Sequence, residues 1–201
     1  MRRTERGQGI WRLDEDRLIT GEAVAQNEPN VRPAYAGVGS RATPRRVLEV
    51  MRKTAEALHR RGFVLRSGGA EGADQAFERG AQGECEIFLP KPNFNGHPSR
   101  LCSPSQGAYE IAAAHHPAWE RLSQAARRLH ARNVHQVLGI ELNDPARLVV
   151  CWTPGGSGGG GTGQAIRVAR ARGVAVFDLG AGCEETLQAI AVFLEQGNQG
   201  K

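Results

Sequence analysis

The part of this chain best suited to binding an anion is a glycine-rich segment, residues 154–163. Glycine lacks a Cβ and adopts positive φ, so successive N–H groups in such a segment can close around a phosphate. An apolar run before it, residues 147–152, predicts a buried strand, and residues 164–172 predict a helix. We expect Thr162 to serve as the helix N-cap or as a hydroxyl that contacts phosphate. The alternative is a flexible glycine linker, which the flanking strand and helix disfavour. The ligand-binding residues predicted most firmly are Gly159, Gly160, Gly161, Thr162 and Gln164.

Two further polar or glycine-bearing turns follow predicted strands. The first comprises Gly39, Ser40 and Arg41, and the second covers residues 67–74. Carboxyl ends of parallel strands meet at one edge of a sheet, where α/β proteins bind ligands, so we expect the three turns to converge there. The alternatives are a solvated charge at Arg41, a tight turn without a ligand at 67–74, and simple helix stabilisation by Asp74. The predicted ligand-binding residues of the second turn are Ser67, Gly68, Gly69, Gly72 and Asp74.

Three polar residues lie within one turn of each other on a predicted helix: Arg132, Asn133 and Gln136. Arginine presents a planar fork of donors to phosphate, and the side-chain amides of Asn133 and Gln136 can hydrogen-bond to the polar edges of a ligand. A solvated helix face is the alternative. Trp152, at the end of its strand, is predicted to stack on a base, and plain packing is equally compatible with its position.

The remaining pattern alternates short apolar strands with amphipathic helices, which is typical of a parallel sheet covered on both faces. The predicted fold class is therefore α/β, a Rossmann-like three-layer sandwich with a mostly parallel sheet. Residues 34–197 are expected to form this domain, and residues 1–33 a partly ordered N-terminal extension. The long loop 91–106 is expected to be functional. The predicted strands are 34–38, 63–67, 85–90, 147–152 and 174–178. The predicted helices are one capped by Thr43 with Pro44 at its first position, one beginning near Ala73, residues 107–139 broken near Pro117, residues 164–172, and residues 184–195.

Composition narrows the functional classes. The chain has 201 residues and a formal net charge of +5, which permits contact with nucleic acid or phosphorylated ligands. The four cysteines show no CxxC spacing, which favours a reducing, cytoplasmic setting without a zinc site. No metal or cofactor is predicted.

No apolar run approaches the roughly 20 residues of a membrane span, and no secretory signal or membrane partner is expected. The dinucleotide fingerprint and the Walker sequence are both missing, which argues against an ordinary dehydrogenase or ATPase.

Taken together, these motifs resemble the SLOG superfamily, which joins DprA (Smf)-like DNA-processing proteins to the LOG-type phosphoribohydrolases. The resemblance rests on residues 39–41, residues 67–74, Arg132-Asn133 and the turn ending at Gly161-Thr162. It covers about residues 34–180 and implies a Rossmann-like pocket for a nucleotide, a nucleotide-derived signal or nucleic-acid phosphates. It also implies that a homodimer is possible.

The chain departs from both branches of that superfamily. LOG enzymes carry a glutamate beyond the threonine of the glycine turn, but residues 163–166 of this chain include no carboxylate, and Gln164 among them cannot take a proton. Asp74 and Glu110 are the catalytic candidates that we carry forward, with Glu71 and Asp178 as further acids. DprA-like proteins carry arginines at the positions of Glu71 and Val134, and losing two cations weakens a DNA-binding interpretation.

Three functional hypotheses follow. The first is binding of a nucleotide or nucleotide-derived small molecule, as a sensor without turnover. The second is cleavage of a nucleoside 5′-monophosphate into base and ribose 5-phosphate, as an N-glycosidic hydrolase. The third is binding of single-stranded DNA during DNA processing or recombination.

Overall fold

The computed structural model describes residues 10–12, 18–20 and 32–197, in two units that are treated separately, Met1–Val31 and Arg32–Lys201. In the first unit, strand β1 (Ile10–Arg12) pairs antiparallel with β2 (Leu18–Thr20). The expectation of a partly ordered extension falls mostly on residues outside the described part of the chain.

The second unit is built on a five-stranded sheet in which all strands run parallel. The strand order is β5-β4-β3-β6-β7, so β3, the first strand of this unit, lies in the centre and the chain builds outward on both sides. The predicted Rossmann-like α/β sandwich is confirmed. The strands are β3 (Ala34–Gly39), β4 (Val64–Ser67), β5 (Cys85–Ile87), β6 (Leu148–Trp152) and β7 (Ala175–Asp178).

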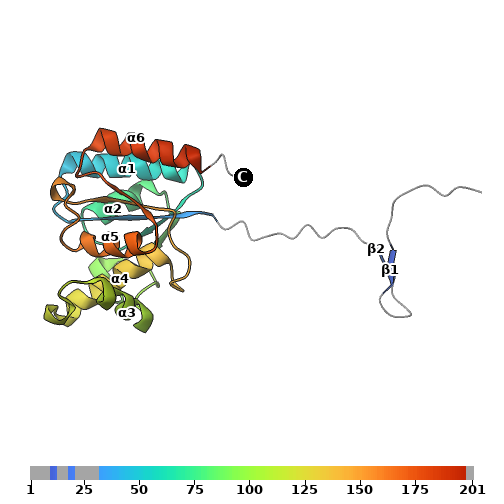
Figure 1. The fold of residues 1–201 in the computed structure, drawn as a ribbon, viewed down its shortest axis with the longest axis horizontal. Helices are drawn as coiled ribbons and strands as arrows, with labels where there is room; N and C mark the ends of the chain where they lie inside the picture. Colours follow the sequence, from blue (N-terminus) through green and yellow to red (C-terminus); the bar gives the residue numbers. More distant parts are fainter. Residues whose placement is uncertain (1–9, 13–17, 21–31, 198–201) are drawn as a thin grey trace, which may run out of the picture. The chain divides into compact units, whose positions relative to one another are not determined.

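Six helices cover the two faces of this sheet (Figure 1). On one face, α1 (Arg45–His59), α2 (Ala73–Gly80) and α6 (Cys183–Gln196) enclose an apolar core. On the other face, α3 (Gln106–His115), α4 (Gln124–Leu138) and α5 (Thr162–Ala171) enclose a second core. Short 3₁₀ turns, η1 (Phe94–Gly96), η2 (Trp119–Arg121) and η3 (Pro154–Gly156), lie in the connections.

Strand β6 shows why the sheet needs a helical layer on each side. Its side chains alternate between the two cores: Leu148 and Val150 enter the first, whereas Val149 and Cys151 enter the second. All four are fully buried. A strand that is apolar on both faces is stable only between two layers, and its carboxyl end then emerges at the edge of the sandwich.

The structure corrects two local predictions and confirms a third. Thr43 does not cap α1; its hydroxyl donates to the carbonyl oxygen of Ser40 at 2.7 Å, and Pro44 occupies the N-cap position. The third strand is shorter than residues 85–90, because after Ile87 the backbone turns to form an isolated bridge between Leu89 and Cys102. The helical region after residue 106 is broken near Pro117 as predicted. Among the described residues, no helix is long and apolar enough to cross a membrane.

Candidate functional site

The candidate site lies where the strand order reverses. From β3 the chain continues to β4 on one side, whereas β6 was added on the other side. The connections that leave the carboxyl ends of β3 and β6 therefore diverge and leave a crevice between them, which is the usual ligand position in open parallel sheets. Residues 39–41 follow β3 and residues 153–161 follow β6.

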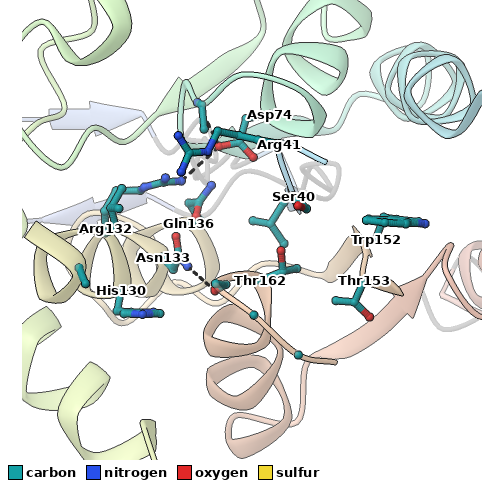
Figure 2. A pocket seen from close by; sticks show the side chains of 18 of the residues that line it. Ser40, Arg41, Asp74, His130, Arg132, Asn133, Gln136, Trp152, Thr153 and Thr162 are labelled. Carbon is teal, nitrogen blue, oxygen red and sulfur yellow. Dashed lines mark hydrogen bonds and ion pairs between the residues drawn. The ribbon is translucent and has the colours of Figure 1, made fainter. Parts of the chain in front are cut away.

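A pocket of about 510 Å³ occupies this crevice (Figure 2). Its walls come from five places: the end of β3, the end of β6 with the glycine-rich turn, the start of α2, one face of α4, and the loop 91–106. The structure brings most of the predicted site residues together here. Those that line the pocket are Gly39, Ser40, Arg41, Asp74, Arg132, Asn133, Gln136, Trp152, Gly159, Gly160, Gly161 and Thr162.

The glycine-rich turn before α5 borders the pocket with free backbone donors. Within the described part of the chain, the N–H groups of Gly159, Gly160, Gly161 and Thr162 donate to no protein acceptor. A Cβ added at Gly160 or Gly161 would meet no atom within 4 Å. Thr162 is the first residue of α5, with Gly161 at the N-cap position, and its side chain makes no capping bond. The predicted N-cap role of Thr162 is therefore wrong, because the hydroxyl lies one position inside the helix.

A carboxylate at the end of β7 holds the start of this turn. Asp178 accepts hydrogen bonds from the N–H groups of Thr153 and Gly180, each at 2.9 Å, and from the Thr153 hydroxyl. The Thr153 hydroxyl in turn accepts from the N–H of Gly158 at 2.9 Å. At the other end of the turn, the Asn133 amide donates to the carbonyl oxygen of Gly161 at 3.1 Å. We call residues 154–163 the open turn, because the N–H groups at 159–162 have no acceptor among the described residues. Side chains thus fix the open turn at both ends.

The second glycine-rich turn, residues 67–74, is filled by the protein itself. The Ser67 hydroxyl donates to the carbonyl oxygen of Gly37 at 2.7 Å, and the Asp74 carboxylate accepts from the N–H of Ala70 at 3.2 Å. A Cβ at Gly68 would lie 1.4 Å from an Arg132 guanidinium nitrogen, so this side chain covers the turn. The predicted ligand-binding residues Ser67, Gly68, Gly69 and Gly72 do not line the pocket.

Arg132 and Asp74 form an ion pair at the inner wall of the pocket, with 3.3 Å between Nη1 and Oδ2. Asp74 is 2% exposed and Arg132 is 6% exposed. Burial raises the pKa of the Asp74 carboxyl, and the Arg132 guanidinium acts in the opposite direction. Burial likewise lowers the pKa of Arg132, opposed by Asp74. Each charge therefore depends on the other to remain ionised in this wall.

The pocket face of α4 carries buried polar atoms that have no partner among the residues that the structure describes. Gln136 is fully buried, and neither the oxygen nor the nitrogen of its side-chain amide makes a hydrogen bond to that part of the chain. The same holds for Nε of Arg132 and Nδ1 of His130. Burial lowers the pKa of His130 to about 4, and His116, Arg167 and Arg132 act in the same direction. His130 is therefore a neutral ring at pH 7.

Two further predicted site residues lie away from the pocket. Gln164 is fully buried and joins helices: its amide nitrogen donates to the carbonyl oxygen of Ala112 at 2.9 Å, and its oxygen accepts from Arg167 at 2.8 Å. Its position two residues inside α5 turns it toward α3 instead of toward the glycine turn. Glu110 lies on an exposed face of α3, where it accepts from Gln106 at 3.1 Å.

Several pocket residues were missed from the sequence. Phe94 and Asn95 come from the long loop 91–106, which was expected to be functional without a residue being chosen. Two more, Ala126 and Leu129, share the α4 face with His130, and the helical spacing from Arg132 was the available signal. No group of three His, Cys, Asp or Glu side chains among the described residues could hold a metal ion. The other missed lining residues are Val38, Ala70, Thr153, Pro154 and Ser157.

Fold and pocket together define an α/β protein of Rossmann-like architecture, with a cavity lined by polar and apolar groups at the point where the strand order reverses. Among solved structures, the chain resembles DNA processing protein A from Helicobacter pylori, described for its single-stranded DNA binding mode. The TM-score is 0.51 with 17% sequence identity, over 73% of this chain and 65% of that chain. This chain thus matches less than two thirds of that protein, and the likeness extends to the fold. It agrees at that level with the resemblance to DprA-like proteins. No protein-family model and no curated protein matches the sequence.

Proposed function

We propose that this protein binds a nucleotide or nucleotide-derived ligand, with a phosphate on the turn at Gly159–Gly161 and the remainder in the pocket beside α4. The observation that carries the proposal is a set of four N–H groups, at residues 159–162, that have no acceptor in the described part of the chain and border a cavity at the start of a helix. Such donors and the positive end of the α5 dipole suit a phosphate.

The other polar groups near the turn support the same ligand. The Ser40 hydroxyl oxygen already accepts from the N–H of Ala42 at 3.0 Å, so its hydrogen is free to donate. Arg41 is exposed and has no ion-pair partner among the described residues, which leaves its charge available to an anion. A cavity of about 510 Å³ lies within the range of about 300 to 1,000 Å³ for small-molecule sites.

The test is calorimetric titration with inorganic phosphate, AMP and ADP-ribose. We expect binding of the phosphorylated ligands and about tenfold weaker binding by Arg41→Ala, because a cation near the phosphate is lost. Arg170→Ala removes an exposed cation from α5 outside the pocket and should leave affinity unchanged. No heat at millimolar ligand, or equal effects of the two variants, would contradict the proposal.

Single-stranded DNA binding is a second candidate, favoured by the fold shared with DNA processing protein A and by the net charge of +5. A DNA phosphate would use the same turn. Titration of oligonucleotides at several salt concentrations distinguishes the two candidates, because contacts to many phosphates give a steep salt dependence and contact to one gives a shallow dependence. No retardation of single strands even at low salt would remove this candidate.

Cleavage of an N-glycosidic bond is a third candidate, and it would depend on Asp74. Among the described residues that line the pocket, Asp74 is the only carboxylate. Its pairing with Arg132 keeps it from acting as a free base unless a ligand displaces the guanidinium. Chromatography of nucleoside monophosphates after incubation with the protein tests this candidate, since turnover releases free base and Asp74→Asn should abolish the release.

A further inference from the structure

The feature that goes beyond phosphate binding is the Gln136 side chain. It is fully buried, it lines the pocket, and both atoms of its amide lack a partner among the described residues. A buried donor or acceptor without a hydrogen-bond partner is destabilising, so two such atoms on one side chain indicate a missing partner. That partner must offer a donor and an acceptor close together.

The position of Gln136 relates it to the phosphate-binding turn. Asn133 precedes it by three residues on the same face of α4 and contacts Gly161 through its amide nitrogen at 3.1 Å. Arg132 precedes it by four residues and pairs with Asp74 at 3.3 Å. Gln136 therefore lies between the turn and the ion pair, as Figure 2 shows. In a nucleoside 5′-phosphate, the group joined directly to the phosphate is the sugar.

The neighbours of Gln136 favour a sugar over a base. The polar groups that line the pocket together with Gln136 include the Asp74 carboxylate, the Arg132 guanidinium and the Asn133 amide. A nucleobase needs flat apolar faces on which to stack, and the large aromatic side chains of the pocket, Trp152 and Phe94, come from β6 and from the loop 91–106 rather than from α4. Each ribose hydroxyl is both a donor and an acceptor, so a pair of adjacent hydroxyls can satisfy the oxygen and the nitrogen of one amide.

We propose that Gln136 binds the ribose hydroxyls of the ligand, so that the pocket selects ribonucleotides over 2′-deoxyribonucleotides. This inference rests on the proposed phosphate site and names the sugar that accompanies the phosphate. A site built to hydrogen-bond a hydroxyl discriminates strongly against the analogue that lacks it, because the buried amide is then left unpaired. We expect a preference of at least tenfold for the ribose form.

The experiment is calorimetry with inorganic phosphate and two matched ligand pairs: ribose 5-phosphate with 2-deoxyribose 5-phosphate, and AMP with 2′-deoxy-AMP. The wild-type protein should prefer the ribose member of both pairs at least tenfold. Gln136→Met keeps the length and volume of the side chain and removes both polar atoms. It should reduce both preferences to within about threefold while the affinity for inorganic phosphate stays unchanged. Gln124→Met makes the same change at the exposed start of α4 and should keep the preference.

The outcomes separate this inference from the proposed function. Binding of phosphate with equal affinity for ribose and deoxyribose ligands overturns the role of Gln136 and leaves the phosphate site standing. A preference that survives in Gln136→Met also overturns it. Absence of binding by phosphate and by all four organic ligands contradicts the proposed function itself. The wild-type comparison of the two sugar phosphates needs no variant, so it decides the question even if Gln136→Met does not fold.

Discussion

The two glycine-rich turns of this protein, residues 67–74 and 154–163, have similar compositions and opposite surroundings. In the first, Arg132 lies across Gly68 and the Asp74 carboxylate already accepts from a turn amide, so the anion position is occupied by the protein's own side chain. In the second, four consecutive amides have no acceptor among the described residues. A glycine turn thus becomes a candidate site only where the rest of the fold leaves its donors uncovered.

The largest expected effect on stability comes from a substitution in the first turn, residues 67–74, which Arg132 covers. Gly68→Ala would place a Cβ 1.4 Å from an Arg132 nitrogen, so the guanidinium must move and Asp74 would remain buried without its partner. Breaking a buried pair in this way should lower the free energy of unfolding by about 3 kcal/mol. Urea unfolding measures the change. A variant as stable as the wild type would show that the turn is not held by this ion pair.

Next in size is the loss of the link that holds the open turn to β7. Thr153→Val removes the hydroxyl that donates to Asp178 and accepts from Gly158, which leaves a turn amide unpaired. We expect a loss of about 2 kcal/mol in unfolding free energy together with weaker phosphate binding. Thr153→Ser restores the hydroxyl and should recover most of both. Stability lost without any change in affinity would mean that Thr153 does not position the turn.

A substitution in the open turn should change binding and leave stability alone. A Cβ at Gly161 meets no atom within 4 Å, and its φ is −62°, which any residue adopts. Gly161→Ala should therefore change the unfolding free energy by less than about 0.5 kcal/mol. The added methyl group would stand where we propose the phosphate, so affinity should fall about tenfold, or about 1.4 kcal/mol. Unchanged affinity in calorimetry would place the ligand away from this turn.

The smallest effect concerns the α4 wall that faces the open turn. His130 has a pKa of about 4 in the folded protein, below the ordinary value of 6.5 for histidine, so the unfolded chain takes up a proton first as the pH falls. The contribution of His130 to stability is complete above pH 6.5 and is lost between pH 6.5 and 4. Because the ring is only half-buried, we expect a loss of about 1 kcal/mol.

The groups that face this ring are His116, Arg167 and Arg132, all of which oppose its protonation. Burial also lowers the pKa of His116, which adds to the same acid sensitivity. Unfolding measured at several pH values should show a shallower decline for His130→Gln than for the wild type. His59→Gln, outside the pocket, should decline as the wild type does.

The periodic parts of the fold could be predicted because local patterns decide them. Short apolar runs alternating with amphipathic helices are compatible with few architectures, and the break near Pro117 follows from the stereochemistry of proline. The residues of the open turn and the Arg132, Asn133 and Gln136 group were also chosen from the sequence, by glycine content, by helical spacing and by the resemblance to the SLOG superfamily. Helix ends were less secure, since Thr43 and Thr162 have the residue type of a cap but neither forms one.

Contacts between distant segments decided the rest. Gln164 was an attractive ligand-binding residue beside the glycine turn, but the neighbouring helix α3 supplies its partner at Ala112. The role of Gly68 depends on Arg132, which is 64 positions away in the chain and reaches it only in the folded protein. A local sequence pattern spans only a few residues, so it cannot reveal a contact between Gly68 and Arg132.

The amino-acid sequence by itself determined that strands end in turns with exposed backbone donors and that one face of a helix carries polar side chains. Only the tertiary structure decided which turn stays open, that Asp74 is paired with Arg132, and that the Gln136 amide, in the lining of a cavity, has no partner among the described residues. The physical reason is that glycine content sets the freedom of the backbone, whereas the availability of a hydrogen-bonding group depends on what the remainder of the chain packs against it.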